Sequence, residues 1–125
     1  DLTVCMNVIT VPNTAKRKAM WDGIAAVTKR GGHALVVVAS IEAERMIEKL
    51  LDEEPADHAN GLVDHDGALQ KHFARDELGD DFSRAGFAVK KIGKAFYPWS
   101  KEGLRPTPRL RANPPWDWVA LAERI

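Results

Sequence analysis

Two short apolar runs separated by one helical segment constrain this chain more than any other feature. The first run is nearly continuous from Leu2 to Ile9, and the second, Ala34 to Val38, is rich in valine. Continuous apolar runs of this length are typical of strands covered on both faces of a parallel sheet. Between them we expect a helix from about Ala15 to Lys29, capped by Thr14 and ended by Gly31-Gly32. A strand–helix–strand unit of this kind implies a right-handed parallel crossover and an α/β fold.

Helix and strand signals continue to alternate in the rest of the chain. We expect helices from Glu42 to Asp52, capped by Ser40, and from Arg75 to Arg84. Strands are expected from Phe87 to about Ile92 and from Trp116 to Ala122, where Trp116 and Trp118 share a face. Because a long connection joins these two strands, the last one is free to return antiparallel to its neighbour.

Apolar periodicity predicts which faces of the helices are buried. In the first helix it selects Met20, Ile24 and Val27, and in the third Leu78, Phe82 and Ala85. In the second helix the inward residues are Ala43, Ile47, Leu50 and Leu51, and the outward ones are Glu42, Glu44 and Glu48. Ala56 to Lys71 loses periodicity and is expected to be a surface excursion, and Tyr97 to Pro115, which holds five of the seven prolines, an irregular connection.

Length and charge restrict the class of protein. The 125 residues suffice for one domain with a modest core, and the formal charge of +0 gives no reason to expect a nucleic-acid partner. The single cysteine, Cys5, cannot form an intrachain disulfide, which fits a reducing compartment. The sequence has neither an apolar stretch of membrane-spanning length nor a signal peptide at its start. We therefore expect a cytoplasmic protein with no membrane contact.

The order of these signals resembles the C-terminal half of a class I S-adenosylmethionine-dependent methyltransferase. The resemblance rests on the strand ending Cys5-Met6-Asn7-Val8-Ile9, the strand Ala34 to Val38 and the helix-to-strand turn Arg84-Ala85-Gly86-Phe87. It implies a partial Rossmann-like three-layer sandwich over residues 1–125, with a mostly parallel sheet and an antiparallel last strand. No glycine-rich G-x-G-x-x-G loop is present. We therefore expect an N-terminal half, with most of the site for S-adenosylmethionine, to be missing, and this fragment to be inactive alone.

The resemblance also assigns one wall of the cofactor site. In the family, the strand with a D-x-x-x-C-x-N-V-type sequence lies beside the methionine portion of the cofactor. Carried over, this places Cys5, Met6, Asn7 and Val8 along that wall. The alternative for Cys5, Met6 and Val8 is ordinary apolar core, whereas the carboxamide of Asn7, at the end of an apolar strand, needs hydrogen-bond partners.

The substrate side is expected to include Lys71, His72, Tyr97 and Trp99. Asp66 to Phe73, Tyr97 to Glu102 and Pro115 to Trp118 resemble segments of a bacterial subset of these enzymes. His72, which is mostly neutral near pH 7, is the candidate catalytic base toward a hydroxyl or amine acceptor. The alternatives are that His72 ends a surface loop, that Lys71 is solvated, and that Tyr97 and Trp99 pack the long loop onto the sheet.

Two further hypotheses remain open. His58, His65 and His72 recur every seven residues near Asp57, Asp64 and Asp66, but no known ligand spacing is met and we expect no metal site. The alternative to an enzyme is a non-enzymatic α/β partner-binding or assembly module acting through the basic segment Lys90 to Arg111. The expected partners are an unidentified methyl acceptor, the missing N-terminal half and a second copy of the chain.

Overall fold

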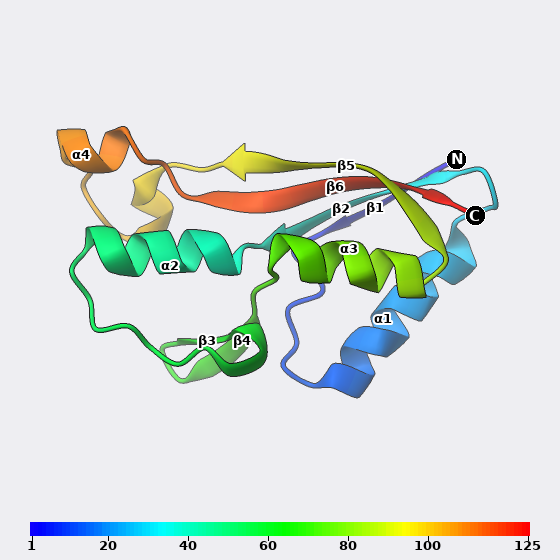
Figure 1. Cartoon of the computed structure of the whole chain (residues 1–125), viewed down its shortest axis with the longest axis horizontal. Helices are drawn as coiled ribbons and strands as arrows, with labels where there is room; N and C mark the ends of the chain where they lie inside the picture. Colours follow the sequence, from blue (N-terminus) through cyan, green and yellow to red (C-terminus); the bar gives the residue numbers. More distant parts are fainter.

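A computed structural model describes all 125 residues and has two sheets and four α-helices. The main sheet has four strands in the order β1-β2-β6-β5 (Figure 1). The strands are β1 Leu2–Met6, β2 His33–Ala39, β3 Leu62–His65, β4 Ala68–Lys71, β5 Phe87–Phe96 and β6 Trp116–Arg124. The helices are α1 Thr14–Val27, α2 Ile41–Leu50, α3 Arg75–Arg84 and α4 Pro108–Arg111, with short 3₁₀ turns η1 Ala59–Gly61 and η2 Trp99–Glu102.

Strand directions confirm the expected sheet. β1 and β2 pair in parallel, and β6 is antiparallel to both β2 and β5. It follows that β1, β2 and β5 run in one direction and only the last strand, β6, runs in the other. The crossover from β1 to β2 passes through α1, as the first two apolar runs predict.

Local signals explain where the helices begin. The Ser40 side chain accepts a hydrogen bond from the Ala43 N–H at 3.0 Å, which confirms the predicted cap of α2. For α1 the cap is Asn13 rather than Thr14, because the Asn13 carboxamide oxygen accepts from the Lys16 N–H at 2.9 Å. After α3, the backbone of Gly86 has φ +91°, a left-handed conformation that suits glycine.

The core lies between the sheet and the helices α1 and α3. Phe82 is fully buried and makes edge-to-face contacts with Trp21 and Phe87, at centroid distances of 4.8 and 5.6 Å. The predicted faces of α3 and β6 are confirmed, since Leu78, Phe82, Trp116 and Trp118 are all buried. In α1 the prediction is wrong for Val27, which is 69% exposed.

The other face of the main sheet carries no helix (Figure 1). Thr3 faces α1, because its hydroxyl accepts a hydrogen bond from the Thr28 hydroxyl at 2.7 Å. The side chains that alternate with Thr3 along β1 point the opposite way: Leu2 is 60% exposed, Val4 53% and Met6 59%. The expectation from the apolar run that both faces of β1 are covered is therefore wrong for this chain, whose main sheet has helices on one face.

The segment expected to be an excursion without regular structure contains a hairpin. β3 and β4 pair in antiparallel register, from Leu62 opposite Lys71 to His65 opposite Ala68. The two-residue loop Asp66-Gly67 has positive φ at both positions, the conformation of a tight hairpin turn. The hairpin joins the main body through backbone hydrogen bonds from Lys71 to Thr10 and from Phe73 to Ala39, both 2.8 Å.

None of the helices is both long enough and apolar enough to cross a lipid bilayer.

Candidate functional site

Three parallel strands of the main sheet end at the same edge. β1 ends at Met6, β2 at Ala39 and β5 at Phe96, while the antiparallel β6 begins there at Trp116. Ligands of open α/β sheets bind beyond the carboxyl ends of parallel strands. α2 starts at this edge, and the β3–β4 hairpin and η2 lie beside it (Figure 1). The side chains at this edge therefore form the candidate site.

The end of β1 forms the first wall of the edge. Cys5 is half-buried, and burial raises the pKa of its thiol against a smaller opposing hydrogen bond from the backbone of Val8. Met6 and Val8 are 59% and 54% exposed, so they are not core residues here. Ile9, fully buried, anchors the chain behind them.

Asn7 occupies a special backbone position within that wall. Its φ of +55° is left-handed, and its N–H donates to the Val37 carbonyl at 2.8 Å, one step beyond the β1–β2 pairing. Asparagine tolerates this conformation better than most residues. The side chain is exposed, and the expected hydrogen-bond partners of its carboxamide are not found within the chain. Its carboxamide is instead free to meet a ligand.

Lys71 is neither at an exposed rim nor solvated. Its side chain is 2% exposed, and its ammonium donates to Glu77 Oε2 at 2.7 Å and to the Asn60 carbonyl. The same nitrogen lies 5.2 Å from the centre of the Phe73 ring. All of these partners belong to the chain itself, so Lys71 holds the hairpin and η1 against α3.

His72 forms a stacked pair with His65. The ring centres are 5.2 Å apart at an interplanar angle of 18°, and the two Nε2 atoms are 3.0 Å apart. His72 is buried, and burial, with a smaller contribution from His65, lowers its pKa from 6.5 to about 4. The expectation that His72 is neutral near pH 7 agrees with this. His65 is the exposed member of the pair and was not predicted as a site residue.

Tyr97 and Trp99 have different partners. The Tyr97 hydroxyl donates to Glu102 Oε1 at 2.7 Å, and burial followed by this bond raises its pKa. Trp99 is 2% exposed, packs with Ile47 and Leu110, and donates to the Leu110 carbonyl at 2.6 Å. Trp99 therefore fixes the proline-rich connection to α2, which is close to the alternative that it packs the long loop onto the sheet.

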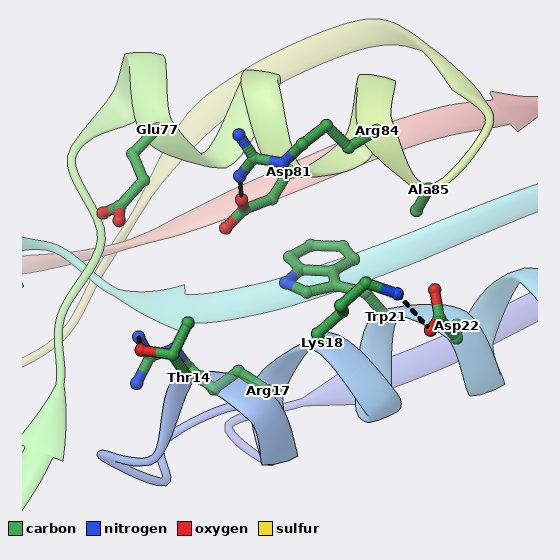
Figure 2. A pocket seen from close by; sticks show the side chains of 9 residues that line it. All are labelled: Thr14, Arg17, Lys18, Trp21, Asp22, Glu77, Asp81, Arg84 and Ala85. Atoms are coloured by element: carbon green, nitrogen blue, oxygen red, sulfur yellow. Dashed lines mark hydrogen bonds and ion pairs between the residues drawn. The ribbon is translucent and has the colours of Figure 1, made fainter.

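A separate hollow of about 340 Å³ lies between α1 and α3. Figure 2 shows that its charged side chains face one another across it, with Lys18 paired to Asp22 at 2.9 Å and Arg84 paired to Asp81. The Arg17 guanidinium donates to the Pro12 carbonyl at 2.7 Å. Its cations are thus engaged within the chain, and none of the predicted site residues lines it.

Two of the seven basic residues in the segment Lys90 to Arg111 have partners within the chain. Lys90 pairs with Glu123 at 3.1 Å, and Lys94 lies 4.0 Å from the centre of the Trp116 ring. Both partners lie on β6, so these two cations are engaged by the neighbouring strand.

Comparison with known proteins places this fold. No protein-family model matches the sequence, and no curated protein matches it. Among solved structures, a S-adenosylmethionine-dependent methyltransferase from Methanosarcina mazei aligns over 100% of this chain and 59% of its own, with a TM-score of 0.67 and 16% identity. The chain therefore shares its fold with part of a S-adenosylmethionine-dependent methyltransferase.

Two other methyltransferases show the same similarity. The enzyme from Mesorhizobium loti has a TM-score of 0.62 at 13% identity, covering 99% of this chain and 61% of its own. The 1,6-didemethyltoxoflavin-N1-methyltransferase of Burkholderia thailandensis, solved with S-adenosylhomocysteine, has a TM-score of 0.63 at 15% identity, covering 99% and 43%. The chain thus spans roughly half the length of the methyltransferases that it resembles.

Proposed function

We propose that this chain is the C-terminal portion of a S-adenosylmethionine-dependent methyltransferase that methylates an acceptor still to be identified. The observation that carries the proposal is the strand order β1-β2-β6-β5 with a single reversed strand, at whose carboxyl edge the unpaired Asn7 and the His65–His72 pair gather. Fold alone does not determine function. The side chains at this edge are the reason to prefer an enzyme over an assembly module.

One wall of the cofactor site would be formed by Cys5, Met6, Asn7 and Val8. The exposed Met6 and Val8 offer apolar contact, and the free carboxamide of Asn7 offers both a donor and an acceptor. When bound, the cofactor supplies a methyl group on a sulfonium, so the protein's task is to position the acceptor and to exclude water. The glycine-rich turn and the acidic residue for the ribose would come from the N-terminal half.

The acceptor side would include the hairpin and the proline-rich connection. His72 is buried and held in place, so we assign contact with the acceptor to its exposed partner His65, and proton acceptance to the pair. Tyr97 and its partner Glu102 would border the acceptor on the opposite side. Lys71 and Trp99 would act by fixing the elements on which these groups stand.

The uncovered apolar face of the main sheet supports a covalently linked or separate N-terminal half as partner. Leu2, Val4 and Met6 are more than half exposed on an edge strand, a surface that stable proteins rarely leave open. A layer of helices packed there would complete the three-layer sandwich. On this proposal, the 125-residue chain alone binds S-adenosylmethionine weakly or not at all, and calorimetry showing micromolar affinity for it would contradict the proposal.

The division of labour is tested in the intact protein. Asn7→Gly keeps the left-handed backbone and removes the carboxamide, so we expect cofactor affinity to fall by about 0.5–1.5 kcal/mol, the net value of one hydrogen bond. Asp52→Gly, at another left-handed and exposed position, is the matched control and should change nothing. His65→Ala and His72→Ala should lower the single-turnover rate and leave cofactor affinity unchanged. Equal effects of the Asn7 and histidine variants on cofactor affinity would refute this arrangement.

A further inference from the structure

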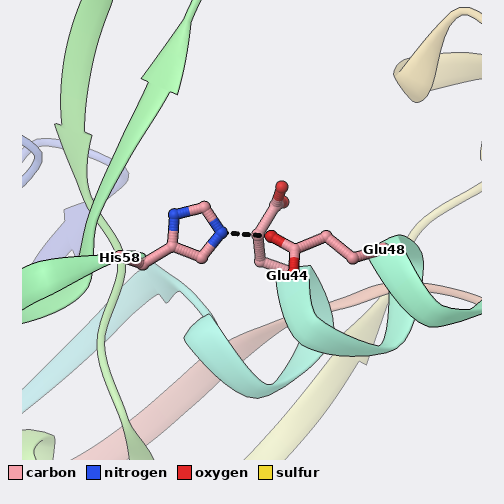
Figure 3. A group of neighbouring side chains, drawn as sticks. All are labelled: Glu44, Glu48 and His58. Carbon is pink, nitrogen blue, oxygen red and sulfur yellow. Dashed lines mark hydrogen bonds and ion pairs between the residues drawn. The ribbon is translucent and has the colours of Figure 1, made fainter. Parts of the chain in front are cut away.

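Glu44, Glu48 and His58 converge at one point beside the carboxyl edge (Figure 3). The two glutamates stand one helical turn apart on α2 and therefore share a face. His58 approaches from the loop that follows, just before η1. One ligand atom from each of the three side chains lies within 4.8 Å of the others.

Burial distinguishes this group from an ordinary acidic surface. The side chains of Glu48 and His58 are 8% and 7% exposed, and the Glu48 carboxylate contacts His58 Nε2. Glu48 is the only acidic residue in the chain that is buried. A carboxylate at such a depth needs compensating charge or strong hydrogen bonds. The apolar periodicity of α2 predicts that Glu48 faces outward, and its burial against His58 shows that this prediction is wrong.

The cluster has little positive charge of its own. The nearest cation, Arg45, is 3.6 Å from Glu48 Oε2, is half exposed and also donates to the Ala56 carbonyl at 2.7 Å. Of the two carboxylates, Glu48 is paired with this one peripheral guanidinium, and Glu44 has no Lys or Arg partner. A divalent cation between them would supply the charge that the fold lacks.

The third ligand stands on a fixed support. The Gly61 N–H donates to the His58 carbonyl at 2.9 Å, and the buried Lys71 ammonium holds the carbonyl of Asn60, within the same turn. Gly61 itself takes φ +72°. These contacts keep His58 over α2 without help from a ligand, so the cluster is held together before any cation binds.

We propose that Glu44, Glu48 and His58 form a binding site for a divalent transition-metal ion, with Zn²⁺ as the expected ligand. Two carboxylate oxygens and one imidazole nitrogen match the ligand types of zinc sites with one open position. Bonds of about 2.0–2.2 Å place tetrahedral ligand atoms roughly 3.3 Å apart, which modest rotation of the glutamate side chains achieves. Mg²⁺ prefers oxygen ligands alone and should bind much more weakly.

This site does not depend on methyl transfer. It lies on α2 and its loop, outside the β1 wall assigned to the cofactor, and its test is a binding measurement. The sequence-based expectation of no metal site was based on a different ligand set, the three histidines with Asp57, Asp64 and Asp66. The structure instead brings His58 to two glutamates of the preceding helix, and leaves His65 and His72 paired with each other.

The test is calorimetric titration of chelator-treated protein with Zn²⁺ and, separately, with Mg²⁺. We expect one Zn²⁺ per chain, and at least a tenfold loss of affinity in Glu48→Gln and in His58→Ala. Glu123→Gln and His33→Ala are matched controls on β6 and β2 and should bind as the unsubstituted protein does. Circular dichroism of each variant establishes that it is folded.

Cobalt gives a second readout that a purely structural role would not change. Co²⁺ bound by the three side chains should show visible absorption bands that His58→Ala abolishes and His33→Ala retains. The proposal is overturned if no stoichiometric Zn²⁺ binding occurs. It is also overturned if folded Glu48→Gln and His58→Ala bind normally, or if His65→Ala alone removes binding, which would place the ion at the histidine pair.

Discussion

Lys71→Met tests whether Lys71 is a structural residue or a substrate ligand. Methionine keeps most of the length of the side chain, so no large cavity forms. The substitution removes only the ammonium, which bridges the Asn60 carbonyl and Glu77.

The magnitude follows from the two partners. Loss of the donor leaves the part-buried Asn60 carbonyl without its partner, a cost of about 1–3 kcal/mol at most. Glu77 is 40% exposed, so water replaces the ammonium there and the loss is small. The cation over Phe73 adds about 0.5–1 kcal/mol, and relief of the buried charge offsets part of the total. We expect the free energy of unfolding to fall by about 2 kcal/mol.

Urea denaturation measures this, with Lys90→Met as the matched control. Lys90 also pairs with a glutamate, Glu123, but is half exposed, so its substitution should cost less than about 0.5 kcal/mol. If Lys71→Met costs no more than Lys90→Met, the ammonium does not hold the hairpin and the reasoning fails. A raised KM with unchanged stability would return Lys71 to the substrate side.

Two further predictions concern the same region of the chain. The folded pKa of His72 is about 4, below its unfolded value of 6.5, so the unfolded chain binds the extra proton first as pH falls. The contribution of His72 to stability is therefore complete above pH 6.5, and the free energy of unfolding falls by about 3 kcal/mol as pH drops toward 4. Urea titrations at several pH values measure this loss, which His72→Gln should largely abolish. In the same assay, Gly61→Ala should lower the free energy of unfolding by more than 3 kcal/mol, because the added Cβ would strike the His72 backbone and lie 2.8 Å from Lys71 Nζ. Gly103 is equally left-handed but has open space around it, so Gly103→Ala should cost only about 1 kcal/mol. Similar losses for the two variants would contradict the packing described.

The fold was largely predictable from sequence because its signals are local. The apolar runs, the Ser40 cap and the Gly86 turn each act within a few residues and agree with one another. The face of α1 was misjudged because Thr28 replaces Val27 in the interior, where its hydroxyl bonds to the Ile24 carbonyl and to Thr3. A polar residue satisfied in this way leaves no mark in an apolar periodicity.

The sequence does contain a signal for the hairpin, although it was interpreted only as a turn. Asp66-Gly67 between two short segments is a strong hairpin pattern, and Asp64 reinforces it by accepting from the Gly67 N–H at 2.7 Å. The strands themselves are mostly exposed and lack alternation, which is why periodicity failed there. Recognising the hairpin would have brought His65 opposite Ala68 and close to His72.

The site residues were harder to predict because they depend on contacts between distant segments. The burial of Glu48 follows from His58 in the next loop, and the burial of Lys71 follows from Asn60 and Glu77. Neither the spacing nor the composition of the sequence indicates that these residues are partners. What the sequence did indicate is the edge at which these groups meet, because strand direction fixes where parallel strands end.

The uncovered sheet face leads to a last prediction, on association. β1 is an edge strand with an unpaired backbone, and Val4 at its centre is 53% exposed beside the similarly exposed Leu2 and Met6. Such a surface promotes pairing between copies. We expect the 125-residue chain to sediment as a dimer or larger species, and Val4→Lys, which places a charge on that face, to shift it toward monomer. Val27→Lys, on α1 and 69% exposed, introduces the same charge elsewhere and should leave association unchanged. A monomeric unsubstituted chain, or equal behaviour of the two variants, would show that this face is stable in water and does not require a covering layer.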